Sequence, residues 1–357
     1  MTQNQRPATR GRGAVTNEIL RYAEHRREAI DDGWGADAPS PIATSVDIDH
    51  SREIISYNDS PDIPFDRSVN PYRGCEHGCI YCYARPSHAW LGLSPGLDFE
   101  TRLFQKPDAA AQLERALAAP RYRPATLALG ANTDPYQPIE RRLTLTRAIL
   151  RVLADCRHPV VVTTKSALVL RDREILAEMA AEGCAAVMIS LTTLDLDLAR
   201  RLEPRAATPT RRLAVIEALA KAGVPVGVLV APVIPALTDA DLERILDQAA
   251  TAGAIRACSQ LIRLPHEVGE LFTQWLATHY PQRAAKVLGL IRQCRGGRLN
   301  DPAFVARHRG QGPIADLLRQ RFLLAARRAG LATDPDGWRF ETDRFRPPRG
   351  PQLSLFD

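Results

Sequence analysis

Several features that define common protein classes are missing from this 357-residue chain. No window approaches the roughly 18 consecutive apolar residues of a membrane span. The polar, basic start "MTQNQRPATRGRGAVTNE" has no apolar core of the kind that secretion signals carry. No Gly-x-Gly-x-x-Gly motif or P-loop follows the first predicted strand, which argues against dinucleotide and nucleoside triphosphate folds. We therefore expect neither a membrane partner nor a nucleotide cofactor of those types.

Cysteine is scarce, and its distribution makes a poor disulfide framework. The seven cysteines are odd in number, and four of them stand alone in the sequence. We expect each of these four to be a small buried hydrophobic residue. The pattern suits a reducing, cytoplasmic environment in which the other three bind a metal or take part in catalysis. The four isolated cysteines are Cys156, Cys184, Cys258 and Cys294.

The charge balance permits a polyanionic partner without requiring one. The chain has 47 Lys and Arg against 41 Asp and Glu, which gives a net charge of +6 and a pI near 9.1. Arg-rich sequences reach such values easily. DNA is therefore compatible with the composition but is not indicated by charge alone.

A repeating strand–helix pattern occupies the middle of the chain. The predicted strands are nearly continuous in Val, Ile, Leu and Ala, as in parallel sheets buried on both faces. Gly183, Gly223 and Gly253 follow predicted helices directly before the next strand, as C-terminal caps do. Such repeats give a doubly wound sheet or a full or partial barrel. The strands are predicted at residues 125–134, 159–166, 185–193, 224–235 and 257–265, and the helices between and before them at 141–155, 171–183, 208–223 and 239–253.

Composition divides the chain into four regions. Residues 1–45 are predicted to form a largely irregular N-terminal extension. Residues 46–270 hold the α/β domain, and residues 271–330 are patterned as helices. Residues 331–357 carry Pro, Gly, Asp and Arg without periodicity, so we expect a flexible tail there.

Three cysteines within eight residues mark the chemistry. Cys75, Cys79 and Cys82 lie in "GCEHGCIYCYARP". A structural zinc site needs four ligands, and His77 is the nearest candidate for the fourth. The Cys-x-x-x-Cys-x-x-Cys spacing suits a cubane iron–sulfur cluster better, because such clusters prefer one thiolate per iron. Three thiolates then leave one iron open to an exogenous ligand.

Polar residues recur at the predicted carboxyl ends of the strands, where barrels carry their active sites. Any one of them can be a loop starter or a cap. The same placement after four strands favours a ring of ligand contacts. These residues are Asn132, Thr133, Asp134, Thr164, Lys165, Ser190, Thr192, Arg263 and His266.

The cysteine motif followed by a strand–helix repeat resembles the radical S-adenosylmethionine (SAM) superfamily. Further blocks resemble its spore photoproduct lyase-like branch, also called DNA repair photolyase-related, and most closely one uncharacterised bacterial family within it. The resemblance covers roughly residues 50–325 and implies a partial (β/α)6-type barrel with an N-terminal extension and a helical C-terminal region. The blocks are "NDSPDIPFDRSVNPYRGC", "GANTDPYQPIER", "TTKSALVLRD", "RRLEPRAATPTRRL" and "VAPVIPALTD".

The resemblance implies a [4Fe–4S] cluster on the three cysteines, SAM on its open iron, and an electron donor such as flavodoxin or ferredoxin. Tyr81, before the third cysteine, would lie by the adenine. Thr133, Lys165 and Ser190 match positions that hold the methionyl carboxylate and ribose, with Asn132 beside them. A lysine charge and a hydroxyl donor suit a carboxylate.

Within this resemblance, two glutamates each have two alternative roles, and one cysteine of the lyases is absent. Glu140 and Glu203 are either ribose or substrate contacts or surface ion pairs with Arg141 and Arg205. Spore photoproduct lyases place a hydrogen-donating cysteine where this chain has Ala131 and Asn132. Repair of thymine dimers by the same hydrogen-return step is therefore not expected.

The end of the chain carries a second motif. Apolar residues at a free end stay exposed unless a partner receives them. The final "QLSLF" resembles the pentapeptide with which bacterial replication and repair proteins bind the DNA polymerase sliding clamp, a short peptide that orders on binding. The alternative is that the tail folds back on its own domain. The motif residues are Gln352, Leu353, Ser354, Leu355 and Phe356.

Together these features predict a lyase-like radical SAM enzyme that acts near DNA, with damaged DNA as a candidate substrate. The alternative is a non-catalytic, zinc- or cluster-bearing DNA-binding adaptor of the replication clamp. Iron and sulfide content distinguishes a cubane cluster from zinc.

Overall fold

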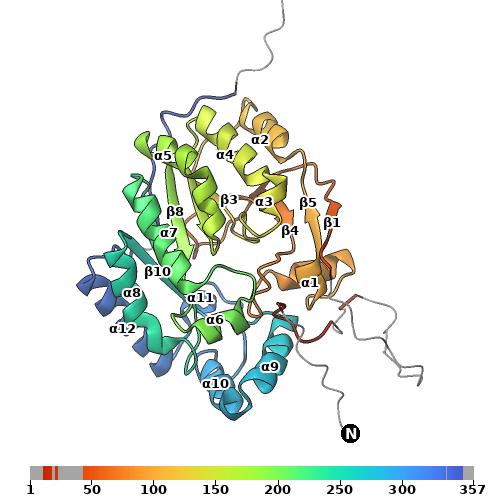
Figure 1. Cartoon of the computed structure of the whole chain (residues 1–357), viewed down its shortest axis with the longest axis vertical. Helices are drawn as coiled ribbons and strands as arrows, with labels where there is room; N and C mark the ends of the chain where they lie inside the picture. Colours follow the sequence, from red (N-terminus) through yellow and green to blue (C-terminus); the bar gives the residue numbers. More distant parts are fainter. Residues whose placement is uncertain (1–10, 18–20, 23–42, 335, 349–357) are drawn as a thin grey trace, which may run out of the picture.

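A curved, largely parallel sheet forms the centre of the molecule (Figure 1). The computed structural model describes residues 11–17, 21–22, 43–334 and 336–348. The strand order is β10-β9-β8-β7-β6-β3-β2, and every neighbouring pair from β3 to β10 is parallel, whereas β2 is antiparallel to β3. The strands are β2 (Ile55–Tyr57), β3 (Arg67–Val69), β6 (Leu127–Leu129), β7 (Val160–Thr164), β8 (Ala185–Ser190), β9 (Val226–Val233) and β10 (Arg256–Leu261).

This sheet confirms the predicted partial (β/α)6 barrel. Each of the five predicted strands overlaps an observed one, from β6 to β10. The parallel strand β3 was not predicted, because "RSV" is too short a run to show a periodic pattern. All six residues of β8 are buried, as expected for a strand covered on both faces.

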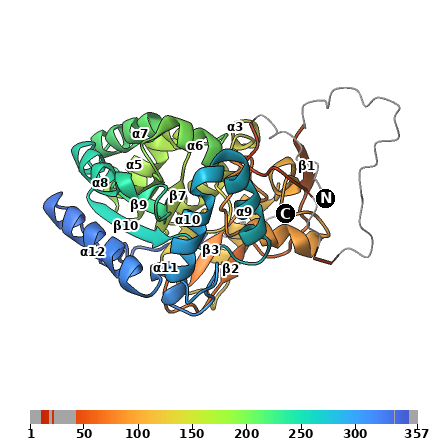
Figure 2. The same ribbon diagram turned by 90° about the horizontal axis from the view of Figure 1, so that it is seen from below.

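Helices cover the outer face of the sheet and contribute the main apolar core (Figures 1 and 2). The backbones of Gly183, Gly223 and Gly253 have positive φ angles after their helices, which confirms them as C-terminal caps. The helices that follow β6 to β9 are α3 (Glu140–Leu143), α4 (Leu145–Asp155), the 3₁₀ segment η2 (Ala167–Asp172), α5 (Arg173–Ala181), α6 (Leu196–Leu202), α7 (Pro209–Lys221), η3 (Asp239–Asp241) and α8 (Leu242–Thr251).

A small second sheet lies beside β3, the first parallel strand of the central sheet in chain order. Its order is β1-β5-β4, with β1 parallel and β4 antiparallel to β5. The segment with Cys75, Cys79 and Cys82, called the cysteine loop below, connects this sheet to η1. The sheet and the helices after it therefore form one wall around the cysteines. The elements are β1 (Ser45–Ile48), β4 (Tyr72–Arg73), η1 (Arg85–Leu91), α1 (Asp98–Thr101), β5 (Arg102–Gln105) and α2 (Ala109–Leu117).

Helices at the C-terminal side close the barrel near its carboxyl edge. Trp275, Phe272 and Leu271 of α9 are fully buried in a second apolar cluster that also contains Cys79 and Tyr81. The helices are α9 (Glu267–His279), α10 (Pro281–Gln293), α11 (Ala306–Arg309) and α12 (Pro313–Arg328). None of the helices in the described ranges is long and apolar enough to cross a membrane.

The segment after α12 packs on the barrel, which corrects the expectation of a flexible tail from residue 331. Ala332 bridges to Arg256 at the start of β10. The Trp338 indole nitrogen lies 3.4 Å from the Met188 sulfur. The Arg346 backbone N–H donates to the Cys156 carbonyl at 2.8 Å. These contacts lie towards the amino ends of the strands, so the described chain leaves the barrel on the side away from the carboxyl ends.

Candidate functional site

The cysteine loop is held in place by side chains from distant parts of the chain. The Cys75 N–H donates to the Phe99 carbonyl at 2.9 Å. The buried Gln137 side chain accepts from the Glu76 N–H at 2.9 Å and donates to the Gly74 carbonyl at 3.1 Å. One amide therefore fixes both sides of Cys75.

A buried ion pair also holds the cysteine loop in place. Arg85 and Glu100 are both fully buried and form a salt bridge. Arg85 also donates to the Cys79 carbonyl at 2.9 Å. The Glu100 carboxylate accepts from the backbone N–H groups of Gly13 and Ala14, each at 2.9 Å. Part of the N-terminal extension is thus built into the support of the cysteine loop.

The three thiols are free of disulfides and lie close enough to interact electrostatically, with Cys75 and Cys79 buried and Cys82 partly buried. Burial, followed by the Asp134 carboxylate and the other two thiols, raises the pKa of Cys75 well above its ordinary value. Burial, together with the charge of Glu203, raises the pKa of Cys79 to about 12, and burial also raises the pKa of Cys82. Buried thiols in this condition need a cation to ionise, as a metal centre provides.

The donor set fits a cluster better than a single ion. Within the described ranges, no three His, Cys, Asp or Glu side chains come together in a way that would hold one metal ion. In a cubane the thiolates bind different irons, so they need not converge on one point. The His77 Nδ1 lies 3.2 Å from the Asp134 Oδ2, so this ring faces a carboxylate rather than completing a set of thiols.

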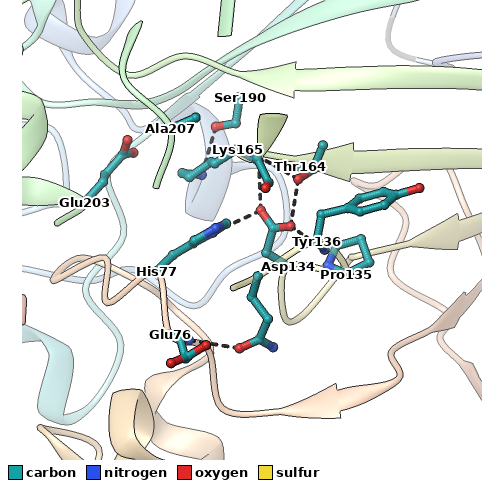
Figure 3. A network of polar contacts seen from close by, with 12 residues as sticks. Glu76, His77, Asp134, Pro135, Tyr136, Thr164, Lys165, Ser190, Glu203 and Ala207 are labelled. Atoms are coloured by element: carbon teal, nitrogen blue, oxygen red, sulfur yellow. Dashed lines mark hydrogen bonds and ion pairs between the residues drawn. The ribbon is translucent and has the colours of Figure 1, made fainter. Parts of the chain in front are cut away.

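Asp134 organises the carboxyl ends of two strands (Figure 3). Its carboxylate accepts from the Thr164 hydroxyl at 2.7 Å and from the Lys165 N–H at 2.8 Å. Burial disfavours the charge, but His77 and these donors outweigh burial and lower the pKa of Asp134 to about 2. Asp134 therefore carries a charge and positions both Lys165 and His77.

Lys165 and Ser190 lie side by side at the ends of β7 and β8 (Figure 3). The Lys165 Nζ donates to the Ser190 hydroxyl at 2.9 Å. Its charge lies close enough to Cys79 and Cys82 to act on the pKa of both thiols, against the effect of burial. In the part of the chain that the structure describes, no carboxylate forms an ion pair with Lys165. The ammonium group is thus available for an anion beside the cysteine loop.

Tyr81 belongs to a buried polar network. Its hydroxyl donates to the Glu203 carboxylate, which also accepts from the Thr192 hydroxyl at 2.7 Å and pairs with Arg212. Burial disfavours the Glu203 charge, but Arg212 and Lys165 outweigh burial and lower the pKa of Glu203 to about 2. The sequence did not single out Arg212, since its partner is only apparent once α7 packs against the strands.

Both glutamates left open by the sequence have other partners than those predicted. Glu203 pairs with Arg212, whereas Arg205 lies 3.1 Å from Glu76. Glu140 is fully buried and bonds to Arg171 at 2.6 Å. Neither glutamate forms the surface pair that was the alternative to ligand binding.

The loop after β6 is fixed by Asn70, a residue that sequence reasoning missed. The Asn70 Oδ1 accepts from the Asn132 N–H at 2.9 Å. The buried Thr133 hydroxyl donates to the Tyr72 carbonyl at 2.9 Å, so its proton is engaged. The Asn132 side chain is exposed at this edge.

The isolated cysteines Cys156, Cys184 and Cys294 are buried and Cys258 is partly buried. The clamp motif, Gln352 to Phe356, lies outside the described residues.

Known proteins are similar to this chain in sequence and in fold. The sequence profile of the Radical SAM superfamily matches residues 69–249. An uncharacterized protein of Mycobacterium tuberculosis is 40% identical over 233 residues, which are 65% of this chain and 68% of the relative. An uncharacterized protein of Methanocaldococcus jannaschii is 27% identical over 173 residues, which are 48% of this chain and 62% of the relative.

The fold is similar to that of spore photoproduct lyase. A mutant of that enzyme aligns with a TM-score of 0.57 and 16% identity, over 81% of this chain and 80% of its own. A complex of the lyase with a dinucleoside spore photoproduct aligns over the same shares with a TM-score of 0.54. The family profile covers more than half of the chain, across the cysteine loop and the strands that carry Lys165 and Ser190. The chain therefore belongs to the radical SAM superfamily, whose enzymes use a [4Fe–4S] cluster and SAM.

Proposed function

We propose that Cys75, Cys79 and Cys82 hold the [4Fe–4S] cluster and that Lys165 and Ser190 hold the carboxylate of SAM beside it. The observation that carries this proposal is the Lys165 ammonium, which has a hydroxyl partner at 2.9 Å and lies next to the thiols. When bound, the cluster supplies the electron that cleaves the sulfonium of SAM and yields a 5′-deoxyadenosyl radical.

Each remaining residue of the site has a role in this arrangement. Tyr81 would present its ring to the adenine, and its bond to Glu203 fixes the orientation of that ring. The Thr133 hydroxyl already donates its hydrogen bond to the Tyr72 carbonyl, so towards the cofactor it can only accept one. Asn132 is exposed at the same edge and offers an amide to a ribose or a substrate.

We assign damaged DNA as the substrate class. The fold likeness to a lyase that binds a dinucleoside photoproduct supports this choice, as does the net charge of +6. The reaction cannot return hydrogen from a cysteine in the loop after β6, because Ala131 and Asn132 occupy that place. We therefore expect a lyase-like radical reaction with a different final hydrogen donor, and reduction of the cluster by a flavodoxin or ferredoxin.

We further propose that the chain is recruited to the DNA polymerase sliding clamp through residues 352–356. The packing of residues 336–348 supports this. The Phe345 ring contacts His158, with a centroid distance of 5.5 Å, and the Arg346 N–H bonds to the Cys156 carbonyl. The final residues thus follow an anchored segment that lies away from Lys165. A partner bound there would leave the carboxyl ends of the strands free.

The test of this function is anaerobic. Protein reconstituted with iron and sulfide is reduced in the presence of SAM, with and without ultraviolet-damaged oligonucleotides. We expect 5′-deoxyadenosine in both cases, and a changed nucleobase only with damaged DNA. Production of 5′-deoxyadenosine without change in any damaged DNA would remove the substrate assignment and leave the radical SAM activity intact.

A further inference from the structure

One arginine beside the cysteine loop forms no ion pair within the described ranges. Arg263 follows β10, between the buried residues Ile262 and Leu264. Side chains alternate along an extended chain, so Arg263 points away from the apolar cluster that contains these two neighbours. Its guanidinium carbon lies 5.1 Å from the centre of the Tyr83 ring, and Tyr83 directly follows Cys82. The charge is therefore placed next to the proposed cluster site.

The neighbouring Arg307 shows by contrast what Arg263 lacks. The Arg307 Nε donates to the Asp62 carboxylate at 2.7 Å, and the pair joins the loop before β3 to α11. No hydrogen bond or ion pair to Arg263 occurs in the described ranges, and its Nε is buried without a partner. A partly buried guanidinium in this condition is costly unless an anion completes it.

The loop beside Arg263 is firmly held. Arg295 is almost fully buried, and its guanidinium donates to the Leu261 carbonyl at 3.1 Å and also to the Ala306 carbonyl. One side chain thus ties α11 to the end of β10. Within the described ranges, the buried Asn300 Oδ1 and His308 Nδ1 also have no hydrogen-bond partner, whereas the His308 Nε2 lies 3.6 Å from the Asp62 carboxylate. This concentration of unsatisfied donors and acceptors indicates a site that a polar ligand or its waters complete.

Exposed aromatic rings accompany these cations. Phe304 is 53% exposed, and the Arg307 guanidinium carbon lies 4.9 Å from the centre of its ring. Tyr83, the partner of Arg263, is 42% exposed. Arginines interleaved with accessible aromatic rings are typical of surfaces that bind single-stranded nucleic acid, where bases stack and guanidinium groups contact phosphates.

We propose that Tyr83, Arg263, Phe304 and Arg307 form a binding surface for a nucleic acid strand, with Arg263 contacting a backbone phosphate. The exposed rings favour this ligand over an acidic peptide, because a carboxylate alone would not use their faces. The inference rests on the proposed function in taking the cysteine loop as the place of reaction. It adds the residues that bring the strand there.

The experiment measures binding of a fluorescently labelled single-stranded oligonucleotide to the full chain by anisotropy, at several salt concentrations. For Arg263→Gln we expect the affinity to fall about tenfold. The slope of log affinity against log salt concentration should become shallower by about one, which corresponds to the loss of one phosphate contact. For Phe304→Ala we expect a loss of about fivefold or more, with an unchanged salt dependence. The matched control is Arg319→Gln, which removes an exposed arginine from α12 and should leave binding unchanged.

Several outcomes would overturn the proposal. Equal affinity of Arg263→Gln and the natural chain would do so. The proposal would also be rejected if a poly-glutamate peptide bound more tightly than the oligonucleotide and its binding also depended on Arg263. The surface would then be a binding site for an acidic protein segment. If Arg263→Gln fails to fold by circular dichroism, Phe304→Ala decides, and unchanged binding by that variant rejects the proposal.

The inference and the proposed function fail in distinguishable ways. Formation of 5′-deoxyadenosine in the absence of nucleic acid reports only on the function. Cleavage of SAM without Arg263-dependent oligonucleotide binding would reject the inference alone. Arg263-dependent binding without SAM cleavage would reject the proposed function and keep the surface.

Discussion

Lys165 and Ser190 end adjacent parallel strands, and the lysine ammonium donates a 2.9 Å hydrogen bond to the serine hydroxyl. The Asp134 carboxylate, in the loop after β6, accepts a 2.8 Å hydrogen bond from the Lys165 N–H and so fixes that backbone. A positive charge and a hydroxyl group are therefore held together at the edge of the sheet where the thiols lie. This is the arrangement on which the assignment of the cofactor carboxylate rests.

Replacing Lys165 should weaken the binding of SAM. In Lys165→Ala the carboxylate loses a charged hydrogen-bond partner, which corresponds to about 1.5–3 kcal/mol. Isothermal titration calorimetry of the reconstituted protein measures the loss. Iron content serves as the control, since no thiolate is changed. An affinity equal to that of the natural chain would show that Lys165 does not contact the cofactor.

The Glu203–Arg212 pair should make stability depend on pH. Glu203 has a pKa of about 2 in the folded protein against an ordinary 4.5. Its contribution is therefore fully present above pH 4.5 and is lost as the pH falls towards 2. Glu203→Gln leaves Arg212 buried without its counter-ion and should lower the free energy of unfolding at neutral pH by roughly 3 kcal/mol.

Urea unfolding at neutral pH and at about pH 3 tests this linkage. The difference between Glu203→Gln and the natural chain should narrow at the lower pH, because below about pH 4.5 Glu203 takes up a proton in the unfolded chain while it stays charged in the folded one. Glu217→Gln is the matched control on α7, the helix that carries Arg212, because the pair of Glu217 with Lys221 is exposed and should contribute little. Parallel pH profiles for Glu203→Gln and the natural chain would refute the assigned pKa shift.

The C-terminal motif should bind a bacterial sliding clamp. Leu355 and Phe356 are expected to be the anchors, each with about 1.5–3 kcal/mol of burial energy. Ordering a free peptide costs part of this, so the affinity should be roughly micromolar. Fluorescence anisotropy with a labelled peptide of residues 346–357 measures it, and Leu355→Ala with Phe356→Ala should abolish binding. If both peptides bind alike, the motif is accidental.

The sequence predicted the parts of the molecule that carry strong local patterns. The strands β6 to β10 were found because apolar residues recur in each and a helix-patterned stretch precedes β7 to β10, and the cysteine loop was found because its spacing is specific. Lys165 and Ser190 were found as polar residues that end such runs. Their hydrogen bond follows from the parallel register of β7 and β8, so the sequence could place them on one edge.

Other features depend on packing between distant segments. The pairing of His77 with Asp134 joins residues from the cysteine loop and the loop after β6, and no local pattern announces it. Arg212 reaches Glu203 only because α7 packs over the strands. The packed tail was missed because Trp338 and Phe345 are isolated aromatic residues in a stretch without periodicity. Such contacts are decided by tertiary structure.

Iron content and 5′-deoxyadenosine formation in two cysteine variants test the central claim most directly. After anaerobic reconstitution, the natural chain should bind about four irons and cleave SAM on reduction. Cys79→Ala removes one of three thiolates and should lose both properties. Cys156→Ala removes a buried thiol outside the loop and should retain both. Loss of iron from Cys156→Ala, or a natural chain that binds zinc and forms no 5′-deoxyadenosine, would contradict the account.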